Sequence, residues 1–222
     1  MSKIFHSLIG ETVQVEVSGK KIINGTVRDI GSDIIVLFDG IDYIYMPIVH
    51  MKNVQVGDKN ENNINMSTDE PGINVDKELS FRKVLTTAKG MFVEIYIASN
   101  QSIHGYVTSI MNNYFVFYSP IFKTMYVTLN HVKWLIPYPI NQRPYGLDNQ
   151  NLPVQPTSLS LARTFEMQVE RLTNEVVVFD MGETKNMIGK INKVADNIVE
   201  LQIARDYPVY LNLHHIKSVR KV

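Results

Sequence analysis

The 222-residue sequence lacks cysteine entirely and has a single tryptophan. Without cysteine, the chain cannot form disulfide bonds, thiolate zinc sites or iron–sulfur clusters, and it has no cysteine nucleophile. It also lacks an excess of either charge, because 22 Lys and Arg balance 22 Asp and Glu. This balance argues against a general binder of nucleic acid or of anionic membranes.

Long apolar runs are absent as well. No stretch of 18 apolar residues occurs, and residues 1–11 are too short and too polar for the core of a signal peptide. We therefore expect no membrane span, no signal peptide and synthesis in the cytoplasm. Hydrophobic residues still make up 45% of the chain, which predicts folded domains rather than a disordered tail.

The sequence does contain one unit that occurs three times. Each copy is centred on a glycine. An Asp or Asn stands eight positions later, before an apolar run, and both residue types suit a tight turn. The three glycines are Gly25, Gly105 and Gly189, and the three later residues are Asp33, Asn113 and Asn197. A fixed self-similarity of this kind indicates tandem copies of one fold.

A second motif closes each copy: a Tyr, four residues, a His, an apolar residue and a Lys. Its nine residues are Tyr45, His50, Lys52, Tyr126, His131, Lys133, Tyr210, His215 and Lys217. We favour a structural explanation, in which Tyr packs over a barrel mouth while His and Lys cap the start of the fifth strand. The alternative is a set of equivalent interaction sites.

The pattern within each copy predicts a mainly-β fold. Val13, Val15 and Val17 alternate with polar residues, which is the period of a half-buried strand. A glycine inside a strand pattern marks a bend or bulge, so we expect a bent strand at 22–30 and another strand at 34–38. A short helix followed by five bent strands is the layout of a small Sm-like (SH3-type) barrel, although an OB-type barrel fits as well.

The expected organisation is three tandem five-stranded barrels, each preceded by a short helix and separated by two linkers. The segments are repeat 1 at 1–56, an acidic Asn-rich linker at 57–79, repeat 2 at 80–137, a Pro-rich linker at 138–157 and repeat 3 at 158–222. Barrels packed in a row would leave unpaired edge strands at both ends, and such edges are templates for pairing with another chain.

The sequence offers little catalytic chemistry. It has no nucleophile elbow, glycine-rich phosphate loop or paired His motif for zinc, and no carboxylate recurs across the three copies. The adjacent His214 and His215 would point to opposite faces of a strand, which argues against a shared metal. We therefore expect no enzyme activity, no cofactor and no metal.

Binding of single-stranded RNA is the alternative function, because Sm-like proteins bind RNA through stacked aromatics and cations. The middle copy has both residue types: Tyr114, Phe115, Phe117, Tyr118, Lys123 and Lys133. The competing explanation is that these aromatics fill a barrel core or a face between barrels. The neutral overall charge favours that explanation.

Four segments resemble the spore coat protein B family of endospore-forming Bacilli. They are FHSLIG at 5–10, VHMKNV at 49–54, NHVKWL at 130–135 and HHIKSV at 214–219. The resemblance covers nearly the whole chain except the linkers, while the family's Gly-Pro turn and its Ser/Lys-rich tail, the phosphorylated part, have no counterpart here. It implies a structural spore coat protein made in the mother cell, with itself and other coat proteins as partners.

Overall fold

The computed structural model describes residues 3–57, 73, 78–98, 101–139, 142, 144–146, 160–182 and 184–222. Their secondary structure is dominated by antiparallel strands, which confirms the predicted mainly-β class. The chain forms two compact units, one of Met1–Ile103 with Val132–Pro144 and one of His104–His131 with Tyr145–Val222. The predicted linkers lie largely outside the described residues, and the predicted repeat boundaries stay predictions.

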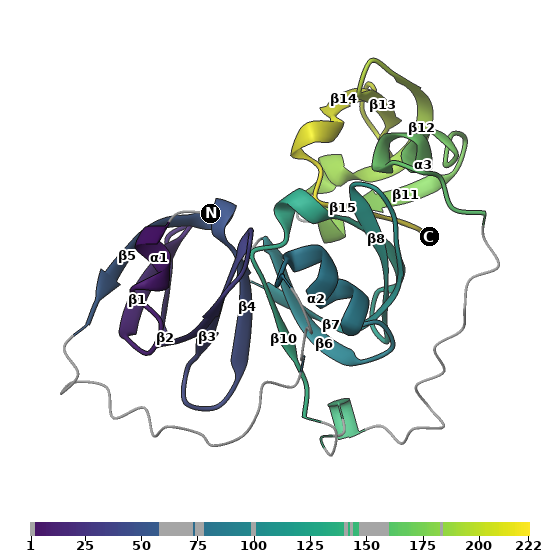
Figure 1. The fold of residues 1–222 in the computed structure, drawn as a ribbon. Helices are drawn as coiled ribbons and strands as arrows, with labels where there is room; N and C mark the ends of the chain where they lie inside the picture. The colour runs from purple at the N-terminus through teal and green to yellow at the C-terminus, as the bar shows by residue number, and fades with distance from the viewer. Residues whose placement is uncertain are drawn as a thin grey trace. The chain divides into compact units, whose positions relative to one another are not determined.

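The first unit contains one continuous strand order, β6-β10-β4-β3-β2-β1-β5 (Figure 1). Its strands are β1 (Thr12–Val17), β2 (Lys21–Ile30), β3 (Ile34–Phe38), β4 (Tyr43–Pro47), β5 (Met51–Val56), β6 (Phe92–Ala98) and β10 (Trp134–Pro137). β3 has the predicted bounds, and β2 begins one residue before the predicted start. Its helices are α1 (Lys3–His6), α2 (Phe81–Thr87) and the 3-10 turn η1 (Ile48–His50).

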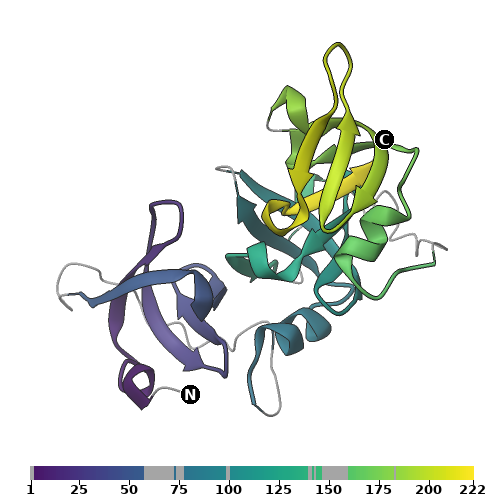
Figure 2. The same cartoon turned by 90° about the horizontal axis from the view of Figure 1, so that it is seen from above.

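The second unit has the order β14-β13-β12-β11-β15-β9-β8-β7. Its strands are β7 (Gln101–Ile110, of which residues 104–110 belong to this unit), β8 (Tyr114–Ser119), β9 (Lys123–Thr128), β11 (Val176–Phe179), β12 (Ile188–Ala195), β13 (Ile198–Gln202), β14 (Val209–Asn212) and β15 (Ser218–Lys221). Its helices are α3 (Phe165–Glu170) and the 3-10 turns η2 (Leu129–His131), η5 (Asp180–Gly182), η6 (Lys185–Met187) and η7 (Leu213–His215). A further turn, η3 (Pro144–Gly146), begins at the end of the first unit. Figure 2 shows β12, β13 and β14 side by side in this unit.

For comparison we call β1–β5, β6–β10 and β11–β15 the first, second and third strand sets. In the first set β1 pairs with both β2 and β5, and in the third set β11 pairs with both β12 and β15. Both sets therefore have the strand order 5-1-2-3-4, counted from the first strand of each set. The shared order follows from the shared sequence pattern.

Each unit encloses an apolar core. In β1 the alternating Val13, Val15 and Val17 are buried, as the period of two predicted, and they pack with residues of β2, β3 and β4. Tyr96 of β6 and Trp134 of β10 complete this core with rings stacked at 4.0 Å. The second unit has its own core, which joins residues of β8 and β9 to α3 and to the third strand set.

At each of the three aligned glycines, the backbone of the paired neighbouring strand lies very close. A β-carbon on Gly105 would stand 2.1 Å from the Tyr118 backbone oxygen, and one on Gly189 would stand 2.3 Å from that of Gln202. The equivalent distance at Gly25 is 3.0 Å. Two residues after each glycine the pairing register shifts: between Val27 and Asp29, between Val107 and Ser109, and between Ile191 and Lys193. Glycine and bulge together bend the second strand of every set.

Replacing Gly105 by Ala tests this close approach of the two strands. The new methyl group would overlap backbone atoms of β8, so the strands must separate, and we expect the free energy of unfolding to fall by about 1–3 kcal/mol. Urea denaturation followed by far-UV circular dichroism measures the change. Gly57→Ala is the matched control, because a β-carbon there lies 3.7 Å from its nearest neighbour, the Thr12 oxygen. An equal loss in both variants would contradict the steric explanation.

Candidate interaction surface

The structure places the repeated Tyr, His and Lys at the same point of each strand set. The Tyr lies in the fourth strand, the His ends a 3-10 turn, and the Lys follows that turn. The tyrosines differ sharply in exposure, since Tyr45 is 1% exposed, Tyr126 is 3% exposed and Tyr210 is 68% exposed. The motif therefore marks a packing position that is covered in two sets and open in the third.

The covered tyrosines have defined partners. The Tyr45 hydroxyl donates a 3.0 Å hydrogen bond to the Ile73 backbone oxygen. Tyr126 packs edge-on against Tyr114 with ring centroids 6.0 Å apart. Burial raises the pKa of Tyr45 to about 12 and also raises the pKa of Tyr126.

The three lysines serve different local purposes. Lys52 forms a 3.0 Å ion pair with Glu16 across the β1–β5 ladder, and its hydrogen bond holds the pKa of that carboxyl below the usual range. Lys133 donates to the Ser18 backbone oxygen. Lys217 contributes its backbone N–H, which donates to a carboxylate oxygen of the buried Asp180 at 2.8 Å.

The histidines do not gather into a common site. The Nε2 atom of His131 lies 3.1 Å from the backbone oxygen of His214. Among the residues that the structure describes, no three His, Asp or Glu side chains come together as a group that could hold a metal ion.

The aromatic residues considered for RNA binding are mostly inside the fold. Tyr114, Phe115 and Phe117 are all fully buried, and Tyr118 is half-buried. Phe115 and Phe117 pack edge-on against each other at 6.2 Å. Buried rings cannot stack on nucleic-acid bases, so Tyr114, Phe115 and Phe117 belong to the core, while Tyr118 keeps part of its surface exposed.

Neighbouring strand sets are joined edge to edge, by what we call strand junctions. In the first unit β4 pairs with β10 at Tyr45 and Leu135. In the second unit β9 pairs with β15 at Tyr126 with Val219 and at Val127 with Ser218. Each junction thus joins the fourth strand of one set to the fifth strand of the next.

The two junctions differ in length for a simple reason. In the second junction the Thr128 N–H donates to the Lys217 oxygen at 2.9 Å, which extends the ladder. The aligned position in the first junction is Pro47, which has no N–H to donate. Only one residue pair joins β4 to β10, whereas two join β9 to β15.

A second contact accompanies each junction, between a turn and the next helix. A carboxylate oxygen of Asp33 accepts the Phe81 N–H at 2.8 Å, at the start of α2. The Asn113 side-chain oxygen accepts the Phe165 N–H at the same distance, at the start of α3. The turn residues of one set therefore satisfy a free backbone N–H of the helix that precedes the next set.

Sequence reasoning identified Asp33 and Asn113 as turn residues and missed this second role. The sequence signal for this contact lies at the start of the helix that donates the N–H. Ser80 and Thr164 cap α2 and α3 with their own side chains, and each is followed directly by a buried Phe. A Ser or Thr before a Phe at the start of an apolar period predicts a helix start.

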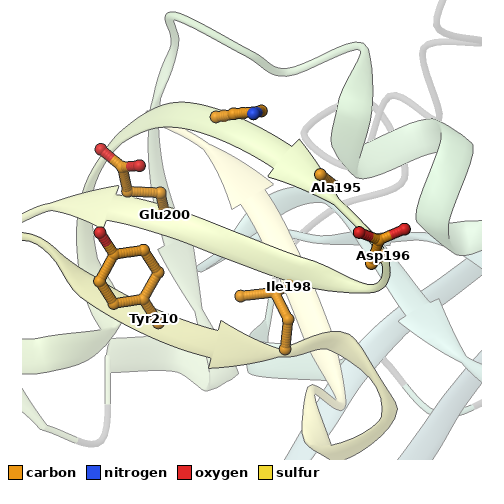
Figure 3. A pocket seen from close by; sticks show the side chains of 6 residues that line it. Ala195, Asp196, Ile198, Glu200 and Tyr210 are labelled. Carbon is orange, nitrogen blue, oxygen red and sulfur yellow. The ribbon is translucent and has the colours of Figure 1, made fainter.

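Within the described strands, β14 lies at one end of its strand order and β5 at one end of the other, and each of these two strands pairs on one side only. Beside β14 lies an open hollow of about 270 Å³, lined by Lys193, Ala195, Asp196, Ile198, Glu200 and Tyr210. Figure 3 shows Tyr210, Ile198 and Glu200 around it. The counterparts of Ile198 in the other two sets, Ile34 and Tyr114, are fully buried, whereas Ile198 is 36% exposed.

The buried Tyr45 makes stability depend on alkaline pH. Its folded pKa of about 12 lies above the ordinary value of 10, so the unfolded chain loses this proton first. The free energy of unfolding should therefore fall as the pH rises from 10 to 12. Tyr45→Phe should flatten this decline, while Tyr207→Phe, at a residue 91% exposed, should leave it unchanged. Chemical denaturation at a series of pH values measures both slopes, and identical slopes in the two variants would contradict the assignment.

None of the helices in the described part of the chain is long and apolar enough to cross a membrane.

Residues 164–219 match the family model described as the YwrJ third domain. The chain is 38% identical to the protein YwrJ of Bacillus subtilis (strain 168) over 221 residues, which are 98% of each chain. It is 25% identical to spore coat protein B of the same organism over 146 residues, or 66% of this chain and 36% of that protein.

These similarities support the expected resemblance to spore coat protein B only in part. The match to spore coat protein B is partial and spans about a third of that protein, whereas the match to YwrJ runs the full length of both chains. Together they relate the chain to two proteins of Bacillus subtilis (strain 168), one of which is a spore coat protein. The chain belongs to the YwrJ family.

Proposed function

We propose that this chain is a non-catalytic structural component of the spore coat, made in the mother cell, that assembles by self-association and by docking onto other coat proteins. The observation that supports this most directly is the pair of strands β14 and β5, each with one unpaired edge at an end of the strand order. An unpaired edge presents backbone donors and acceptors to another chain. The partial similarity to spore coat protein B supplies the coat context.

The polar residues singled out by the repeat also support a structural role. Asp33 and Asn113 hold helix starts, and Lys52 pairs with Glu16 across a ladder. Side chains that bond to neighbouring groups of the fold stabilise the structure and are not available for catalysis. Weak contacts that recur over many copies suit a shell, because multivalency multiplies their combined strength.

Localisation in sporulating cells tests the proposal. The chain fused to a fluorescent protein and expressed from its own promoter should collect as a shell around the forespore, and it should be recovered in coat extracts of purified spores. The fluorescent protein alone is the control. A fusion that stays diffuse in the mother cell would contradict the coat assignment.

A binding assay with labelled poly(U) at low salt separates this proposal from RNA binding. We expect no retention of the RNA by the purified chain. Salt-sensitive retention that is lost in Lys123→Gln and Lys133→Gln would overturn the structural assignment, because those are the cations nearest to the aromatic-rich strands in the sequence.

A further inference from the structure

We infer that β14 of one copy pairs with β5 of a second copy, so that chains associate head to tail. This inference rests on the proposed self-association and names its interface. Both internal junctions follow one rule, because a fourth strand always pairs with the fifth strand of the following set. Among the described strands, β14 is a fourth strand that pairs with no fifth strand, and β5 is a fifth strand that pairs with no fourth strand. The two open edges are the two halves of one further junction.

The second junction predicts the register of this contact. Tyr126 pairs with Val219 there, and Val127 pairs with Ser218. Alignment of the sets on the Tyr/His/Lys motif then places Tyr210 opposite Val54 of the second copy, and Leu211 opposite Asn53. The Asn212 N–H takes the place of the Thr128 N–H, and it would donate to the Lys52 oxygen of the second copy.

Exposure along the open edges fits a missing partner. Tyr210 is 68% exposed, whereas its counterparts Tyr45 and Tyr126 are buried at 1% and 3%. On the other edge, Asn53 is exposed and Val54 is half-buried, whereas the counterparts of Val54, Leu135 and Val219, are fully buried. The same positions are covered wherever a junction exists.

The turn beside β14 also differs from its two counterparts, which take part in the internal junctions. Asp196 and Asn197 both have positive φ, 52° and 61°, in a tight two-residue turn that pairs Ala195 with Ile198. At the two internal junctions the aligned residues Asp33 and Asn113 instead accept a helix N–H, and neither has positive φ. Within the part of the chain that the structure describes, the third turn accepts no N–H from the start of an α-helix.

The geometry of this contact is heterologous. One copy contributes β14 and the other contributes β5, so every bound pair still has one open edge of each kind. Heterologous contacts build rings when they close and filaments when they do not. A two-fold dimer, in which the same patch meets itself, is a different arrangement and gives different mutant behaviour.

Two substitutions block the two edges separately. Tyr210→Lys puts a charge where the junction would bury the side chain, and it faces Glu200 on the neighbouring strand, so the single chain should stay folded. Asn53→Lys does the same on β5, opposite Glu16 of β1. Tyr207→Lys is the matched control, because Tyr207 is 91% exposed and lies in the loop before β14.

Size-exclusion chromatography with light scattering measures the mass of each variant in solution over a range of concentrations. The unsubstituted chain and Tyr207→Lys should grow in mass with concentration, and each edge variant should associate about tenfold or more weakly. An equimolar mixture of Tyr210→Lys and Asn53→Lys should give twice the single-chain mass and stop there, because each variant keeps the edge that the other lacks. Circular dichroism and thermal melting should show all variants folded.

The remaining outcomes overturn the inference in distinguishable ways. If either edge variant associates as the unsubstituted chain does, the contact lies elsewhere and the proposed scaffold role stands. If both variants fail alone and also fail when mixed, the edges do not pair head to tail. If the unsubstituted chain keeps its single-chain mass at every concentration, both this inference and the proposed self-association are wrong. The localisation assay then tests the coat role separately.

Discussion

The backbone pairing of a fourth strand with the fifth strand of the next set is the interaction on which the rest of the structure depends. A set of five short strands spans fewer than about 60 residues, a size at which a chain buries too little surface to be robust alone. The junction adds a neighbouring strand to an edge that would otherwise face water. It also covers Tyr45 and Tyr126, which are among the largest apolar side chains of the two fourth strands.

The helix starts reinforce each junction from a second direction. Asp33 and Asn113 reach the first turn of α2 and of α3, and the backbone of the same turns adds further bonds, from the Ser32 N–H to the Leu79 oxygen and from the Asn112 N–H to the Arg163 oxygen. Asp and Asn can replace each other here because the interaction needs one side-chain oxygen, which both residues have. The presence of Asp at one junction and Asn at the other therefore has a physical reason.

Local pattern was sufficient to predict the strands and insufficient to predict their neighbours. The alternating valines of β1, the bent strand at Gly25 and the bounds of β3 follow from periods of two and from glycine chemistry, which are properties of a few adjacent residues. The partner of Asp33 stands 48 residues away. The exposure of Tyr210 depends on which strand lies beside β14, and three identical motifs cannot show that one of them is uncovered. The aromatic run of β8 was equally ambiguous, since only packing decides whether a ring faces the core.

The proline of β4 has a consequence for how the chain comes apart. Pro47 removes a donor from the first junction, so a single residue pair holds β4 to β10, while β9 and β15 share two pairs and the bond from Thr128. Local opening begins where the fewest backbone bonds must break. Under denaturant or mechanical load, we therefore expect the junction of β4 with β10 to open before the junction of β9 with β15. Amide exchange would register this as an uneven order of opening along an otherwise repetitive chain.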